Sequence, residues 1–326
     1  MARSKIISGI ECDGAATAGI RTVLSSRLDE MCSLREHALK WSDPEGVHDM
    51  RVASRRLRGA LSDFMPFLRK RSLSPSLKQI KTIADSLGQV RDQDVAIMAL
   101  EKLAAKAPAE VSTALSNLVD LRKTMRDKAR EELARTLSKE VLSQLGSEFA
   151  VAVDRATTER PPRKRGTTQQ PGTANVSYRK VSRSIILERL KEFEKLSNGL
   201  YLPLEVEPLH KMRIAAKRLR YALELFEQCW VPSIKIFARK AEGLQSSLGE
   251  VHDCDVWIES FGKELVREKR EGAPSDASAW LLSHFLKVRT RHLRNSLARW
   301  REWEAHKFSS QLQESLQMSS TVHRSE

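Results

Sequence analysis

The sequence predicts an all-α protein built from two duplicated four-helix bundles, and three observations support this. Ala, Leu, Arg, Lys and Glu dominate the 326 residues, whereas there are only 14 glycines and 6% aromatic residues, a composition that favours helices over strands. Apolar residues recur with a helical period along most of the chain. Two segments occur twice and in the same order, which indicates a duplicated domain rather than a short-period solenoid.

The first half is expected to contain a series of helices separated by short breaks. The helices cover residues 16–41, 46–70, 75–106 and 108–137, and a further piece extends to about residue 154. Pro44, Pro75 and Pro108 each stand where a helix would begin, a position that tolerates proline because its missing N–H has no partner there. The first bundle is therefore assigned to residues 1–156.

A linker and four more helices are expected in the second half. Residues 157–174 lack an apolar period and are rich in Pro, Gly, Thr and Gln, which is typical of a linker. A solvated linker explains its basic run 163–165 best, and an anion contact or a localisation-type signal are the alternatives. Helices are expected over 176–198, 207–229, 231–269 and 275–307. The second bundle is assigned to 175–308, and 309–326 is expected to be a polar, frayed tail.

The duplication is read from two pairs of segments. Residues 47–64 (VHDMRVASRRLRGALSDF) and 209–226 (LHKMRIAAKRLRYALELF) are identical at ten of eighteen positions. The second pair, LGQVRDQDVAI at 87–97 and LGEVHDCDVWI at 248–258, follows at nearly the same offset. Two matches in register are unlike a chance similarity between amphipathic helices, so the halves are expected to carry the same functional groups.

The first repeated helix has a basic face opposite an apolar one. At ~100° per residue, one side collects the basic residues His48, Arg51, Arg55 and Arg58. The opposite side collects the apolar residues Met50, Ala53, Leu57, Ala60, Leu61 and Phe64. The second copy repeats the basic face with His210, Arg213, Lys217 and Arg220. Arg56 and Arg218 lie on a flank, near the edge of the apolar face.

These basic faces contain no acidic residue, although a solvated helix face usually mixes charge signs at i,i+4. A solvated or internally paired face would explain one such helix, but its repetition favours an anion site. Arginine binds phosphate oxygens bidentately, and a protonated His48 or His210 would add a donor. A structural or capping role is the alternative for both histidines. The formal net charge of +14 is easier to tolerate beside a polyanion.

Each half also contains an Asp-x-Asp-Val motif, formed by Asp92 and Asp94 and by Asp253 and Asp255. On a helix the two carboxylates point ~200° apart, so both cannot face one ion, and metal binding is disfavoured. One Asp of each pair is expected to orient an arginine of the basic helix. Further basic residues that could line the site are Lys78, Arg91, Arg126, Arg130, Arg239, His252, Arg291 and Arg294.

Several classes of protein are disfavoured by what the sequence lacks. No secretory signal is expected, and no run of ~18 apolar residues would span a membrane. The four cysteines are far apart without a Cys-x-x-Cys pair, so we expect reduced thiols rather than a disulfide frame or a zinc cage. A cytoplasmic location without membrane contact is therefore expected. Single-strand base stacking lacks an aromatic platform on the basic face.

The paired segments VHDMRVASRRLRGAL and LHKMRIAAKRLRYAL, each followed by LG-x-V-x-D-x-D-V, resemble the CHAD domain, the conserved histidine α-helical domain, over about residues 15–305. The resemblance implies two bundles related by pseudo-twofold symmetry around a basic central cavity. It also implies non-enzymatic binding of inorganic polyphosphate and association with polyphosphate granules. The implied ligands are His48, Arg51, Arg55, Arg58, His210, Arg213, Lys217 and Arg220. No cofactor or metal is expected.

Family members are often joined to a triphosphate-tunnel enzyme, but no Glu-x-Glu-x-Lys signature occurs, so a stand-alone binding module is expected. A helical nucleic-acid-binding protein that uses phosphate contacts is the second hypothesis. An enzyme acting on polyphosphate or nucleotides is the third, because it would need converging acids or a metal cluster. The choice between a monomer and a homodimer stays open.

Overall fold

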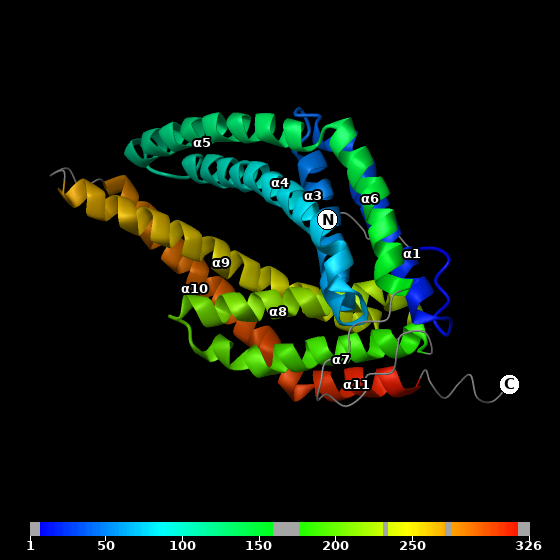
Figure 1. The fold of residues 1–326 in the computed structure, drawn as a ribbon. Helices are drawn as coiled ribbons and strands as arrows, with labels where there is room; N and C mark the ends of the chain where they lie inside the picture. Colours follow the sequence, from blue (N-terminus) through cyan, green and yellow to red (C-terminus); the bar gives the residue numbers. More distant parts are fainter. Residues whose placement is uncertain (1–6, 159–175, 231–233, 271–275, 319–326) are drawn as a thin grey trace. The chain divides into compact units, whose positions relative to one another are not determined.

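The computed structural model confirms the all-α prediction for the residues it describes, which are 7–158, 176–230, 234–270 and 276–318 (Figure 1). Within those ranges there is no β-strand, and the only extended pairing is an isolated bridge between Ala15 and Ser177. The chain divides into two compact units, Met1–Val181 and Ser182–Glu326. None of the described helices is long and apolar enough to cross a membrane.

The first unit is a helical bundle organised around α3. Its helices are α1 (Ala16–Ser33), α2 (Arg35–Ala38), α3 (Pro44–Phe64), α4 (Lys70–Ala104), α5 (Ala109–Thr136) and α6 (Lys139–Thr158), with a 3-10 turn η1 (Met65–Phe67). Helix α3 packs on α1 and α4, and α4 runs alongside α5 (Figure 1). The predicted apolar face of α3 is buried along its length, so its basic face is left toward the surface.

Local sequence fixes where α3 begins. The backbone N–H of Glu45 donates to Asp43 Oδ1 at 3.0 Å, and Pro44 occupies the first helical position, as predicted. Gly46 is required by packing, because a Cβ there would lie 2.1 Å from the carbonyl oxygen of His37. The end of α2 therefore fixes the position of the α3 N-terminus.

The second unit is built around α8 and α9. Its helices are α7 (Tyr178–Leu196, whose first residues belong to the first unit), α8 (Val206–Leu225), α9 (Lys235–Arg270), α10 (Asp276–Ala305) and α11 (Phe308–Met318), with 3-10 turns η3 (Ser197–Tyr201) and η4 (Glu227–Cys229). Helix α9 packs against α8 and α10 (Figure 1). Trp230 is fully buried, and its Nε1–H donates to Ser182 Oγ at 2.9 Å.

Two predicted helix boundaries are wrong. Helix α4 begins at Lys70 and contains Pro75, which was expected to start it. Proline removes one backbone donor there, but Leu73 and Ser76 on either side of it are buried, and this packing offsets the loss. Residues 309–318 of the expected tail instead belong to α11, because Phe308, Leu312 and Leu316 recur every fourth residue and are buried.

Two further expectations concern the cysteines and the start of the linker. Cys12 and Cys229 are disulfide-bonded, whereas Cys32 and Cys254 are free, so the expectation of four reduced thiols is wrong. The reason is that pairing depends on distance in the fold, which spacing along a sequence does not reveal. The linker was expected to begin at residue 157, but helix α6 extends through Thr158. The basic run 163–165 lies outside the described residues.

Candidate anion-binding faces

The basic face of α3 is partly open to solvent in the first unit. His48, Arg51 and Arg55 are half-buried, and Arg58 is exposed. Arg51 Nη1 donates to Asp92 Oδ1 on α4 at 3.1 Å, so this Asp orients an arginine of the basic helix. Gly88 leaves room for that side chain, because a Cβ there would lie 3.2 Å from Arg51 Nη1.

Arg91 on α4 adds a fixed charge beside this face. It lies 3.9 Å from Glu45, and one of its terminal nitrogens is buried without a hydrogen bond. Burial first, and then the Arg91 charge, lower the pKa of His48 below its ordinary value. This lowered pKa favours the neutral form of His48 in the free protein, and the permanent charge of this face comes from arginine.

Asp94 belongs to a deeper layer of the first unit. Its carboxylate is buried, lies 3.8 Å from Arg126 Nη1 on α5, and faces Arg130 on the same helix. Arg130 Nη2 donates to the carbonyl of Trp41 at 3.3 Å and its guanidinium stacks 5.3 Å from the Trp41 ring. Burial raises the pKa of Asp94, and the arginines oppose that rise. Asp94 thus holds α5 arginines and the loop before α3, not an arginine of α3.

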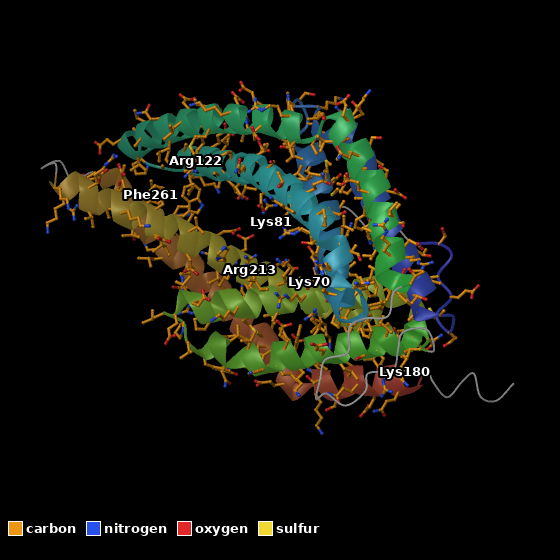
Figure 2. All side chains as sticks on the ribbon, viewed as in Figure 1. Lys70, Lys81, Arg122, Lys180, Arg213 and Phe261 are labelled. Atoms are coloured by element: carbon orange, nitrogen blue, oxygen red, sulfur yellow. The ribbon has the colours of Figure 1, made fainter. Side chains whose placement is uncertain are left out.

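The α8 face of the second unit contains a pair of histidines. His210, Arg213 and Lys217 are half-buried on α8 (Arg213 is labelled in Figure 2). His210 Nδ1 lies 3.3 Å from Nδ1 of His252 on α9, with the ring centroids 4.6 Å apart. Burial, Arg213 and His210 lower the pKa of His252 to about 4, and burial and Arg213 lower the pKa of His210.

Asp255 is the counterpart of Asp94 in the second unit, and it contacts Arg289, which was not predicted to belong to the site. Arg289 Nε on α10 donates to Asp255 Oδ1 at 2.5 Å, and Arg289 Nη1 donates to the carbonyl of Pro203 at 2.7 Å, in the loop before α8. A signal was available, because Arg289 stands in the apolar series Leu281, Phe285 and Leu293 on α10. A charged residue at a buried position requires a buried partner. Asp253, its motif partner, is exposed on α9.

Arg220 does not belong to the exposed face expected for it. Its guanidinium is buried, with Nη1 3.0 Å from Glu242 Oε1 and Nε 3.5 Å from Glu224 Oε1, and it stacks over the Tyr221 ring at 4.8 Å. Two carboxylates therefore neutralise its charge, unlike that of its exposed counterpart Arg58. Arg220 lies on the predicted side of α8, but acidic residues from the next turn of α8 and from α9 contact its side chain.

Arg56 and Arg218, proposed as additional contacts, belong to matched ion-pair triads. The triads are Arg27–Glu30–Arg56, between α1 and α3, and Arg189–Glu192–Arg218, between α7 and α8. Both arginines therefore join helices. The remaining candidates Lys78, Arg239, Arg291 and Arg294 are exposed on α4, α9 and α10.

Within the part of the chain that the structure describes, one group of side chains could hold a cation. Ligand atoms of Glu45, His48 and Asp49 all lie within 4.8 Å of one another. However, a cation there would lie beside Arg91. The repeat also places Lys211 where the first copy has Asp49. We therefore assign these residues no metal role.

Fold and side chains together define an all-helical protein that presents a cationic helix face in each of its two units. The chain belongs to the CHAD domain family, whose family model matches residues 22–262. This membership agrees with the resemblance carried by the repeated segments.

Solved structures and curated relatives are consistent with this membership. The crystal structure of the CHAD domain from the plant Ricinus communis is similar, with a TM-score of 0.66 and 20% identity over 90% of this chain and 94% of that one. PptA from Streptomyces chartreusis has a TM-score of 0.62 and 12% identity over 88% and 100%. The uncharacterized protein Rv2226 of Mycobacterium tuberculosis is 23% identical over 258 residues, which are 78% of this chain and 47% of the relative. The chain thus spans about half the length of this relative.

Proposed function

We propose that the chain binds inorganic polyphosphate through the cationic faces of α3 and α8, without chemical change to the ligand. The observation that carries this proposal is the row of basic side chains on each helix, formed by His48, Arg51, Arg55 and Arg58 and by His210, Arg213 and Lys217. The CHAD resemblance supplies the specific ligand. Charge and helix geometry alone support any polyanion rich in phosphate.

The spacing of these side chains suits a linear chain of phosphates. Successive members stand three or four residues apart, which is about 4.5–6 Å along a helix axis. Each guanidinium offers a planar fork that binds two phosphate oxygens at once. A ligand with a charge on every repeating unit would therefore meet a donor at each helical turn. Arg51 is already oriented by Asp92, which lowers the entropy lost on binding.

A binding role without catalysis is supported by how the acidic residues are used. Asp92, Asp94 and Asp255 each contact an arginine, so these carboxylates serve to position cations. The duplicated bundles, their pseudo-twofold symmetry, the basic central cavity and the association with cytoplasmic polyphosphate granules are implied by the resemblance and form part of this proposal.

Competition binding tests the proposal against nucleic acid. Long-chain polyphosphate, short-chain polyphosphate, single-stranded DNA and double-stranded DNA are compared at matched phosphate concentration and physiological salt. Long-chain polyphosphate is expected to bind tightest, with an affinity that falls steeply as salt rises. Equal or tighter binding of either DNA would overturn the proposal in favour of a nucleic-acid-binding protein.

A separate assay tests the absence of catalysis. Purified protein is incubated with polyphosphate and Mg²⁺, and released phosphate is measured over time. No release above the protein-free control is expected. Release that scales with protein concentration, and that disappears in the Arg51→Ala/Arg213→Ala variant, would show that the basic faces belong to an enzyme.

A further inference from the structure

The histidines His210 and His252 contact each other in a way that limits their charge. Their Nδ1 atoms are 3.3 Å apart, a hydrogen-bond distance. Of two imidazole nitrogens in such a contact, one donates its proton and the other accepts it. The contact therefore contains one Nδ1 proton, and both rings cannot be imidazolium while it persists.

The surroundings of the pair favour its uncharged form in the free protein. The charged groups that face it are Glu207, Arg213 and Lys217 on α8, Asp255 on α9 and, through Asp255, Arg289 on α10. The Asp255 carboxylate already accepts a hydrogen bond from Arg289. Burial and Arg213 lower the pKa of both histidines, so the pair carries little charge at neutral pH although it stands on a cationic face.

We propose that the His210–His252 pair is a proton-coupled phosphate-binding site, an inference that rests on the proposed function. An anionic phosphate oxygen can accept from two donors, whereas the neutral pair has one Nδ1 proton. When a phosphate binds, it replaces the Nδ1···Nδ1 contact and accepts from both rings. The ring that had accepted takes one proton from solvent onto Nδ1 and becomes imidazolium, which the anion stabilises.

The first unit provides an internal comparison for this site. In the repeat, the position of His252 is occupied by Arg91, and His48 corresponds to His210. Arginine keeps its proton at every pH at which the protein is folded. Phosphate binding beside Arg91 therefore needs no proton uptake at that position, whereas binding at the histidine pair takes up about one proton.

Linkage gives the direction of the pH effect. The complex binds about one proton more than the free protein and free ligand, so lower pH favours the complex. Affinity is expected to rise by up to about tenfold for each pH unit between neutral pH and the pKa of the free pair. His252→Arg gives the second unit the fixed charge of the first, and it should remove this dependence.

Calorimetry measures the proton count directly. Long-chain inorganic polyphosphate is titrated into the full chain at pH 6.5 in two buffers of different ionisation enthalpy. The wild type is expected to take up about one proton more than His252→Arg or His252→Gln. His306→Arg, an exposed change in the turn that follows α10, is the matched control and should keep the wild-type value. Circular dichroism checks that each variant is folded.

The outcomes separate this inference from the proposed function. Tight binding with the same proton uptake in the wild type and in both His252 variants would overturn the proton-coupled site and leave polyphosphate binding in place. Absence of polyphosphate binding by the wild type would overturn the proposed function and this inference with it. Loss of uptake in both His252 variants, with uptake retained in His306→Arg, is the result that the histidine contact predicts.

Discussion

The α3 face and the α8 face share a deeper layer and differ in the layer that meets solvent. In the deeper layer, Asp94 lies 3.8 Å from Arg126 and faces Arg130, which donates to the loop before α3. Asp255 accepts from Arg289, which donates to the loop before α8. In the outer layer, the first unit has the fixed charge of Arg91, whereas the second has the titratable His252. The repeat has therefore kept the groups that position the helix and varied a group that a ligand would contact.

The two units also differ in how deeply they bury the ion-pair triads that join the basic helices to their neighbours. In the first unit the side chains of Arg27, Glu30 and Arg56 are 4%, 11% and 11% exposed. In the second unit the corresponding exposures are 14%, 28% and 47%. A buried charge that loses its partner costs far more than an exposed one, so the first unit should depend more strongly on its triad.

The largest effect on stability is therefore expected from Glu30→Gln. This change places a neutral amide, instead of a carboxylate, beside Arg27 and Arg56 and should cost about 3 kcal/mol. Glu192→Gln, in the more exposed triad, should cost about 1 kcal/mol or less. Hydrogen exchange of α3 and α8 peptides reports each unit separately. Equal protection loss in the two variants would break the comparison.

An intermediate effect is expected from pH on the second unit. The pKa of His252 is lowered to about 4, so between that value and its ordinary 6.5 the unfolded chain binds more protons than the folded one. The free energy of unfolding must therefore fall as pH falls through this range. The thermal midpoint of His252→Gln should fall less between pH 7 and 4.5 than that of the wild type. Parallel pH profiles would contradict the shifted pKa.

The smallest effect is expected from alanine substitutions at Gly88 and Gly249, which occupy the same position in the two repeats. A Cβ at Gly88 would lie 3.2 Å from Arg51 Nη1, whereas a Cβ at Gly249 would meet nothing within 4 Å. Gly249→Ala should stabilise its helix by about 0.5–1 kcal/mol and leave polyphosphate affinity unchanged. Gly88→Ala should gain less and weaken binding a few-fold, since it shifts Arg51. Matching results at both positions would mean that the Arg51 position is unimportant.

Helical periodicity was sufficient to predict the all-α class, the apolar faces of α3 and α8, and their basic faces except for Arg220. These features depend on residues within one helix, and the spacing of a single helix is written in its sequence. The expectation that one Asp of each pair orients an arginine of the basic helix agrees with the contact of Asp92 with Arg51 in the first unit. In the second unit Asp255 instead accepts from Arg289 on α10. The start of α4 was not predicted, because packing outweighs the effect of Pro75. The helix α11 was not predicted, because its apolar series is short.

The contacts between helices could not be read in the same way. Whether a basic residue faces solvent or an acid depends on the neighbouring helix, and α9 supplies Glu242 to neutralise Arg220. The pairing of His210 with His252 likewise requires the register of α8 against α9, which no single-helix pattern contains. Arg289 was the exception, because a charged residue within an apolar series already indicates a buried partner.

The central claim is that Arg51 and Arg213 bind the polyanion, and the most direct test removes both. Polyphosphate affinity is measured for two double variants, Arg51→Ala/Arg213→Ala and Arg135→Ala/Lys263→Ala. The second removes two exposed cations that are paired with acids, so both variants have the same net charge as each other. At about 1.5–3 kcal/mol for each charged hydrogen bond, the first variant should bind about 100-fold more weakly or worse, and the second nearly as the wild type. Equal affinities in two variants that both keep their helical circular dichroism would contradict the account.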